Sequence, residues 1–185
     1  MPKIIEDIKE RILESAKCVL LEGNYSGFTI RSVAKKCGIA VGTVYNYYPS
    51  KDILAASVML EDWHKSIHDM RQGCESALTI IEGLRCVYNG ITKFTSIYDK
   101  IWSDYSIRGR TEYLFSEQHK MLRSQLVEII HPLLARFNAD EDEFLEIFIA
   151  ENLLLASANQ FDFKSLEKIL SRILIKHKEG LYEQF

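Results

Sequence analysis

Hydrophobic residues recur at intervals of three and four positions along most of the chain, which is the spacing of an apolar stripe on an α-helix. No segment alternates strictly between apolar and polar positions, as a half-buried β-strand would. We therefore expect an all-α protein. The pattern predicts helices over about 4–22, 30–37, 40–47, 51–71, 76–102, 111–137, 144–160 and 165–178.

The segment from Phe28 to Lys51 predicts two short helices joined by a tight turn. Thr29 is suited to cap the first of them, because its hydroxyl can accept a backbone N–H of the first turn. Gly38 follows this helix where a left-handed residue is least costly as glycine, and Pro49 ends the second helix. These features predict a helix-turn-helix, whose second helix can enter the major groove of DNA.

Charge supports DNA as the partner of this segment. Four basic residues and no acidic ones lie between Arg31 and Lys51, whereas the whole chain has a net charge of −3. The outer face of the second helix carries hydroxyl, phenol and amide groups, which hydrogen-bond to phosphates and contact base edges. The alternative is a helical hairpin that only packs. The predicted DNA-binding residues are Thr29, Arg31, Lys36, Ala40, Val41, Gly42, Thr43, Tyr45, Asn46, Tyr47 and Lys51.

The segment TIRSVAKKCGIAVGTVYNYYPSKDIL resembles the DNA-binding signature of the TetR family of bacterial ligand-responsive repressors. The resemblance covers about residues 8–56. It implies an all-helical dimer that binds a near-palindromic operator, with a divergent C-terminal domain that binds a small-molecule inducer. Ala40 departs from the signature, because the family usually has a polar residue there that caps the second helix.

Two domains are predicted: a helix-turn-helix DNA-binding domain over 1–50, and a helical ligand-binding and dimerisation domain over 51–185. The helix over 4–22 supplies the apolar stripe that completes a three-helix unit with the helix-turn-helix. A long helix that begins at Lys51 then joins the domains, and we expect Gly73 to interrupt it. Because no Pro/Ser-rich linker separates the domains, we expect them to be coupled as rigid bodies.

Aromatic residues concentrate in the middle of the chain, which favours an apolar ligand cavity with a few polar groups. The alternative is that they form the core. Gly83 and Gly90 interrupt a helical pattern, either for close helix packing or to leave room for a ligand. No positively charged cluster lies on these helices, so we expect an apolar or aromatic effector. The predicted ligand-binding residues are Trp63, Tyr88, Phe94, Tyr98, Trp102, Tyr105, Tyr113 and His119.

The last third of the chain has the pattern of an assembly surface. Asp140 and Glu143 have capping-box spacing at the start of a helix. The stretch FLEIFIAENLLLASANQF is apolar nearly all round, which is not typical of a helix with one solvent-exposed face. In the family that the chain resembles, such a helix pair forms a four-helix dimer interface; the alternative is a monomeric core. The predicted interface residues are Phe148, Leu155, Leu166, Leu170 and Ile173.

Enzyme signatures are missing from the sequence. It contains no Walker-type loop, GxGxxG, HExxH or GxSxG motif, so we expect no catalytic residues and no cofactor. His64 and His68 have metal-capable spacing but no third ligand on their face, so no metal site is predicted. The four cysteines lack CxxC spacing, and no signal peptide or apolar run of membrane-spanning length is present. We therefore expect a cytoplasmic protein.

The sequence thus predicts a dimeric repressor that binds operator DNA and is released by a small effector. A helical ligand-binding or assembly module without specific DNA binding is the alternative, and an activator role is also open. The effector, the operator, the regulated genes and any further pairing of dimers on DNA are not specified by the sequence.

Overall fold

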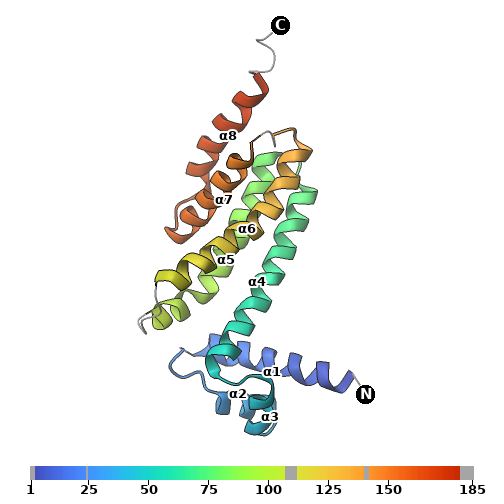
Figure 1. Cartoon of the computed structure of the whole chain (residues 1–185), viewed down its shortest axis with the longest axis vertical. Coiled ribbons are helices and arrows are strands. Elements are labelled where there is room, and N and C mark those ends of the chain that lie inside the picture. Colours follow the sequence, from blue (N-terminus) through green and yellow to red (C-terminus); the bar gives the residue numbers. More distant parts are fainter. Residues whose placement is uncertain (1–2, 24, 107–111, 140–141, 180–185) are drawn as a thin grey trace. The chain divides into compact units, whose positions relative to one another are not determined.

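A computed structural model of the chain describes residues 3–23, 25–106, 112–139 and 142–179. All regular secondary structure in these ranges is helical, which confirms the all-α prediction (Figure 1). None of the described helices is long and apolar enough to cross a membrane. The helices are α1 (Lys3–Glu22), α2 (Ile30–Cys37), α3 (Val41–Tyr47), α4 (Lys51–Ser76), α5 (Ile80–Ser106), α6 (Glu112–Arg136), α7 (Glu143–Ala158) and α8 (Phe163–Glu179).

The chain forms two compact units. Unit 1 comprises Met1–His64 and Ile97–Arg110, and unit 2 comprises Lys65–Ser96 and Thr111–Phe185. The long helices α4 and α5 therefore contribute residues to both units. The boundary expected between residues 50 and 51 separates a DNA-binding domain from a ligand-binding domain. The two compact units are defined by packing, so they do not test this functional boundary, which stays a prediction.

The core of unit 1 follows the predicted stripes. Ile12 and Leu20 of α1 are fully buried, as is Phe28 in the loop before α2. Helix α2 packs against both α1 and α3, and the small side chain of Ala34, buried on α2, permits a close approach. The three-helix unit therefore forms as the apolar pattern indicates, because each stripe has a partner that removes it from water.

Close helix packing explains the glycines in unit 2. A Cβ atom at Gly83 would lie 2.6 Å from the side chain of Leu133, and one at Gly90 would lie 2.4 Å from Met70. Of the two explanations left open for these glycines, the structure supports close packing. Gly73 does not interrupt α4, which continues to Ser76, so that prediction was wrong. A Cβ atom at Gly73 would lie 2.9 Å from that of Cys86, so here too glycine permits two helices to approach.

The start of α5 and the cap of α7 differ from those predicted. Helix α5 begins at Ile80 rather than near residue 76, because Thr79 and Glu82 form a local cap. The Thr79 hydroxyl accepts a bond from the Glu82 N–H at 3.1 Å, and the Glu82 carboxylate accepts one from the Leu78 N–H at 2.8 Å. The cap of α7 is Asp142, whose carboxylate accepts the Phe144 N–H; Asp140 lies outside the described residues.

Candidate DNA-binding site

Helix α2 is held by reciprocal caps at its start and a left-handed residue at its end. The Thr29 hydroxyl accepts the Ser32 N–H at 3.0 Å, and the Ser32 hydroxyl oxygen accepts the Thr29 N–H at 3.1 Å. Gly38 has a φ of 71° and donates its N–H to the carbonyls of the last turn. Both predicted ends of α2 are confirmed. Because the Thr29 hydroxyl is engaged in the cap, a phosphate contact by this residue would have to share it.

Helix α3 presents the predicted recognition face. Its N-cap residue Ala40 has extended backbone and makes no side-chain cap, as its methyl group requires. Val44 and Tyr48 are buried against the rest of unit 1. Tyr45 is 50% exposed. The other predicted contacts of α3 and its cap are exposed (Ala40, Gly42, Asn46) or half-buried (Val41, Thr43, Tyr47).

The predicted basic contacts lie in different environments. Arg31 is exposed. The Lys36 ammonium lies 2.6 Å from the Glu22 carboxylate, and the hydrogen bond to Glu22 raises the pKa of Lys36. The Lys51 ammonium donates to the Tyr25 carbonyl at 3.2 Å and lies 4.4 Å from the centre of the Tyr25 ring. Lys51 therefore helps to fix the start of α4, and its contact with a phosphate remains a prediction.

A polar cluster centred on the buried carboxylate of Asp62 ties α1, α4 and α5 together within unit 1. The carboxylate of Asp62 accepts bonds from the Lys17 ammonium and the Tyr98 hydroxyl, both at 2.6 Å. Burial raises the pKa of the Tyr98 hydroxyl, and the bond to Asp62 raises it further. Tyr98 therefore supports unit 1 as a hydrogen-bonded core residue. Sequence spacing could not reveal this cluster, because its members belong to three separate helices.

The residues predicted to bind a ligand are divided between the units. Trp63 and Tyr98 are buried in unit 1, whereas Tyr88 and Phe94 are buried in unit 2. The Tyr88 hydroxyl donates to the Phe161 carbonyl. The side chains of Trp102, Tyr105 and Tyr113 lie outside the described residues. A shared cavity for these aromatic residues therefore stays a prediction.

His119 lies on the surface of unit 2 beside a shared carboxylate. Its Nε2 atom and the Arg123 guanidinium each lie 2.7 Å from an oxygen of Glu151. Burial acts to raise the pKa of Glu151, but the hydrogen bonds from His119 and Arg123 outweigh it and lower the pKa. Among the described residues, no group of three His, Cys, Asp or Glu side chains could hold a metal ion.

The face predicted for dimerisation needs one correction. Leu170 is 0% exposed, so it belongs to the core of unit 2 and cannot contact a second copy. Leu155 is 59% exposed, and Phe148, Leu166 and Ile173 are half-buried. We call the exposed apolar side chains of α7 and α8 the α7–α8 face; it also includes three residues that the sequence analysis did not select, Phe144, Ile147 and Ile169.

The described helices define an all-α protein with an N-terminal helix-turn-helix and a helical C-terminal part. Residues 12–58 match the family model described as "Bacterial regulatory proteins, tetR family". The N-terminal segment of this chain is therefore similar to the DNA-binding segment of TetR-family regulators.

The similarity to known proteins covers the N-terminal segment in some relatives and most of the chain in others. The transcriptional regulator UidR of Escherichia coli (strain K12) is 27% identical over 67 residues, which are 36% of this chain and 34% of UidR. This match thus spans about a third of the relative. The fatty acid metabolism regulator protein of Bacillus subtilis is 24% identical over 162 residues, 87% of this chain and 80% of that protein. A putative transcriptional regulator from Pseudomonas aeruginosa has the same fold, with a TM-score of 0.60, 17% identity and coverage of 95% and 90% of the two chains.

Proposed function

We propose that this protein is a transcriptional repressor that binds a near-palindromic operator as a homodimer and is released by a small molecule. The observation that carries the proposal is the surface of α3, where uncharged hydrogen-bonding groups are exposed beside the cations of α2. A solvated surface helix is usually rich in charged residues, whereas α3 has none. A cytoplasmic location belongs to the same proposal, because the partner is DNA.

Individual contacts on α3 follow from chemistry and exposure. Thr43, Tyr45 and Tyr47 carry hydroxyl groups suited to phosphate oxygens. Asn46 carries an amide that can pair with an adenine edge in the major groove. A Cβ atom at Gly42 would meet nothing within 4 Å, so the helix is open there to a close approach by bases.

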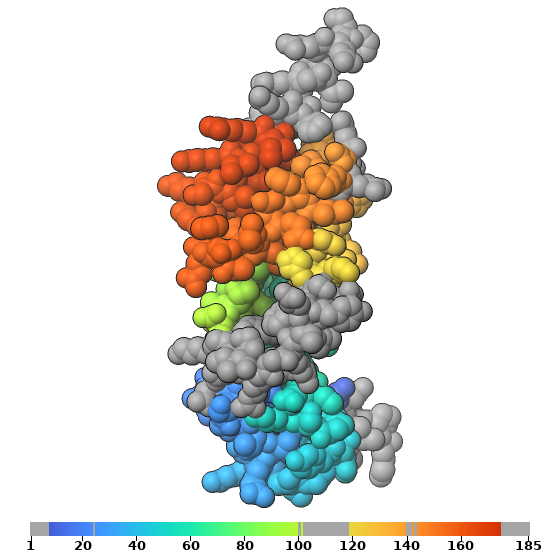
Figure 2. Space-filling view, turned by 60° about the vertical axis from the view of Figure 1, so that its left-hand side comes forward, coloured from blue at the N-terminus to red at the C-terminus, as the bar shows by residue number. Residues whose placement is uncertain are grey.

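A dimer is required for operator binding of this kind. Two recognition helices reach successive major grooves only if they are about 34–36 Å apart on one face of the duplex. The α7–α8 face is suited to a two-fold contact, because it exposes large apolar side chains on two helices that pack together. Figure 2 shows these helices (orange to red) side by side on one face of unit 2.

The test is binding to duplex DNA from the region upstream of the protein's own gene. We expect specific binding that weakens steeply with salt, because phosphate contacts release counterions. An unrelated duplex of equal length is the control. Equal affinity for both duplexes would favour the helical ligand-binding module without specific DNA recognition. Transcription measured with and without the protein then separates a repressor from an activator.

A further inference from the structure

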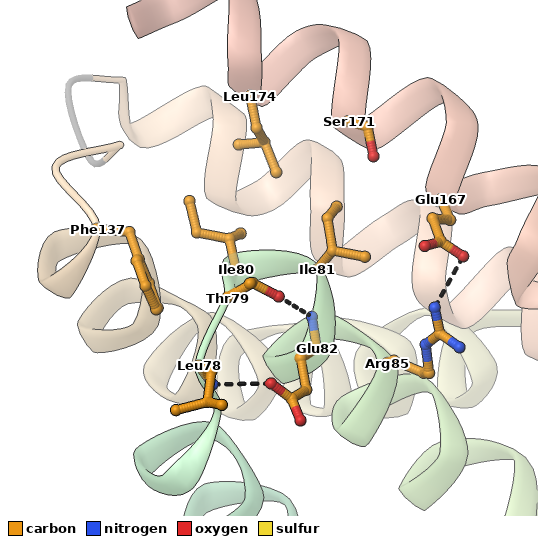
Figure 3. A pocket seen from close by; sticks show the side chains of 10 residues that line it. All are labelled: Leu78, Thr79, Ile80, Ile81, Glu82, Arg85, Phe137, Glu167, Ser171 and Leu174. Carbon is orange, nitrogen blue, oxygen red and sulfur yellow. Dashed lines mark hydrogen bonds and ion pairs between the residues drawn. The ribbon is translucent and has the colours of Figure 1, made fainter.

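A pocket of about 840 Å³ opens in unit 2, between the start of α5, the residue after α6 and one face of α8 (Figure 3). This volume falls within the range of about 300–1,000 Å³ that is usual for small-molecule sites. None of the described residues that line the pocket is an aromatic residue that the sequence analysis selected.

The pocket has an apolar end and a polar end. Figure 3 shows Ile80 and Ile81 of α5 facing Leu174 of α8, with the Phe137 ring at one side. On the other side lie the Ser171 hydroxyl and the ion pair of Arg85 with Glu167, whose N–O distance is 2.9 Å. Such a division suits a molecule with a lipophilic body and one hydrogen-bonding end.

Charge narrows the class of ligand. Arg85 is the one basic residue among the described residues that line the pocket, and its guanidinium is already paired with Glu167. Glu82 adds a second carboxylate. A ligand carboxylate would therefore bring a third negative charge to a single guanidinium, which like-charge repulsion disfavours. We propose that this pocket binds an uncharged lipophilic molecule with a hydrogen-bonding end.

A contact chain leads from the pocket to the end of α4. The Arg136 guanidinium lies 4.7 Å from the centre of the Phe137 ring. The same guanidinium donates to the Glu75 and Ala77 carbonyls, which lie in the last turn of α4 and directly after it. A ligand that displaces Phe137 therefore acts on the end of α4, the helix that begins at Lys51 after the helix-turn-helix. The inference that this ligand is the effector rests on the proposed function. The inference that the ligand binds to the pocket does not depend on it.

The first experiment measures binding by calorimetry without DNA. The probes are decanol and decanoate, which share a chain and differ in charge. We expect decanol to bind and decanoate to bind at least about tenfold more weakly, a difference of about 1.4 kcal/mol. Equal or tighter binding of decanoate would overturn the charge argument. No binding of decanol to the folded protein would overturn the site itself.

Two variants locate the bound decanol. Ile80→Glu places a charge in the apolar end and should abolish binding. Met121→Glu makes a comparable change at an exposed residue of α6 outside the pocket and should leave binding intact. If circular dichroism shows that Ile80→Glu is unfolded, Ser171→Glu replaces it. Unchanged affinity in a folded pocket variant contradicts the assignment.

The second experiment tests the relay to α4. In the wild type, decanol should weaken operator binding several-fold, and the operator should weaken decanol binding by the same factor. Arg136→Gln should keep decanol affinity and lose this coupling, whereas Arg71→Gln, at an exposed arginine of α4, should keep both. Decanol binding without any effect on the operator complex would refute the effector role. Failure of the wild type to bind any operator would refute the proposed function and leave the pocket result standing.

Discussion

The two units present surfaces with opposite chemistry. The α3 surface of unit 1 exposes hydroxyl and amide groups beside the cations of α2, whereas unit 2 exposes large apolar side chains along α7 and α8 and holds a largely apolar pocket. Binding through the first surface should depend strongly on salt. Binding through the second should depend on the apolar area removed from water. The comparison teaches that one chain can place a surface suited to a polyanion and surfaces suited to lipophilic groups in different units.

The largest effects should come from substitutions of apolar residues in unit 2. A buried side chain should affect the stability of the fold, and an exposed one should affect the dimer. Leu170→Ala should lower the free energy of unfolding by about 2–5 kcal/mol, because it leaves a cavity in the core. Leu155→Glu should leave a folded protein but disrupt the dimer, because it places a charge on the α7–α8 face. Denaturant unfolding and light scattering measure the two effects. A folded Leu155→Glu dimer that binds operator normally would show that the interface lies elsewhere.

Substitutions on α3 should affect DNA binding and not stability. Asn46→Ala should cost about 1–3 kcal/mol at one or two operator positions if its amide makes a bidentate contact with a base. Tyr47→Phe should weaken binding to all sequences alike, because it removes the hydroxyl that we propose binds a phosphate. Fluorescence anisotropy with a set of single-base operator variants distinguishes the two. Unaltered operator affinity in both proteins would refute the assigned face.

Substitutions at the caps of the two short helices, α2 and α3, should change stability by smaller amounts. Thr29→Ala should destabilise the protein by about 1 kcal/mol, since it removes the hydroxyl that caps α2. Ala40→Ser should stabilise α3, because it supplies the side-chain cap that this helix lacks. Thermal unfolding of the two variants should shift in opposite directions, and a shift in the same direction would contradict the capping account.

The smallest effect should be pH-dependent and confined to unit 2. Because the pKa of Glu151 is lowered in the folded state, its ionised form is favoured by folding. This contribution is present above the pKa of an unfolded glutamate, about 4.3, and is lost as the pH falls through the lower folded value. Glu151→Gln should therefore be less stable than wild type at pH 7 and equally stable in strong acid. A difference that persists unchanged in acid would exclude ionisation as its cause.

Unit 1 could be predicted closely because its signals are local. The cap of α2, the left-handed Gly38 and the burial of Val44 all depend on residues a few positions apart. A local signal in unit 2 was missed: Thr79 and Glu82 have the spacing of a capping box and start α5 at Ile80. The candidate DNA-binding face therefore followed from periodicity, capping residues and charge.

The candidate ligand site could not be predicted in the same way. The aromatic residues that suggested a cavity include Tyr98, which binds the carboxylate of Asp62 on another helix. The pocket instead combines the start of α5 with Phe137 and one side of α8. None of these segments has a sequence signal that indicates the others, because they meet only when the helices pack.

The sequence by itself determined the helical class, the helix-turn-helix and the residues that α3 exposes. These properties depend on hydrogen bonds and side-chain spacing within about one helical turn, which are written into neighbouring positions. Tertiary structure alone decided that Gly83 faces Leu133, that Leu170 is buried while Leu155 is exposed, and that Arg136 holds the end of α4. Helix α7 is apolar nearly all round, so periodicity could not say which side faces inward; only packing against the other helices of unit 2 made that choice.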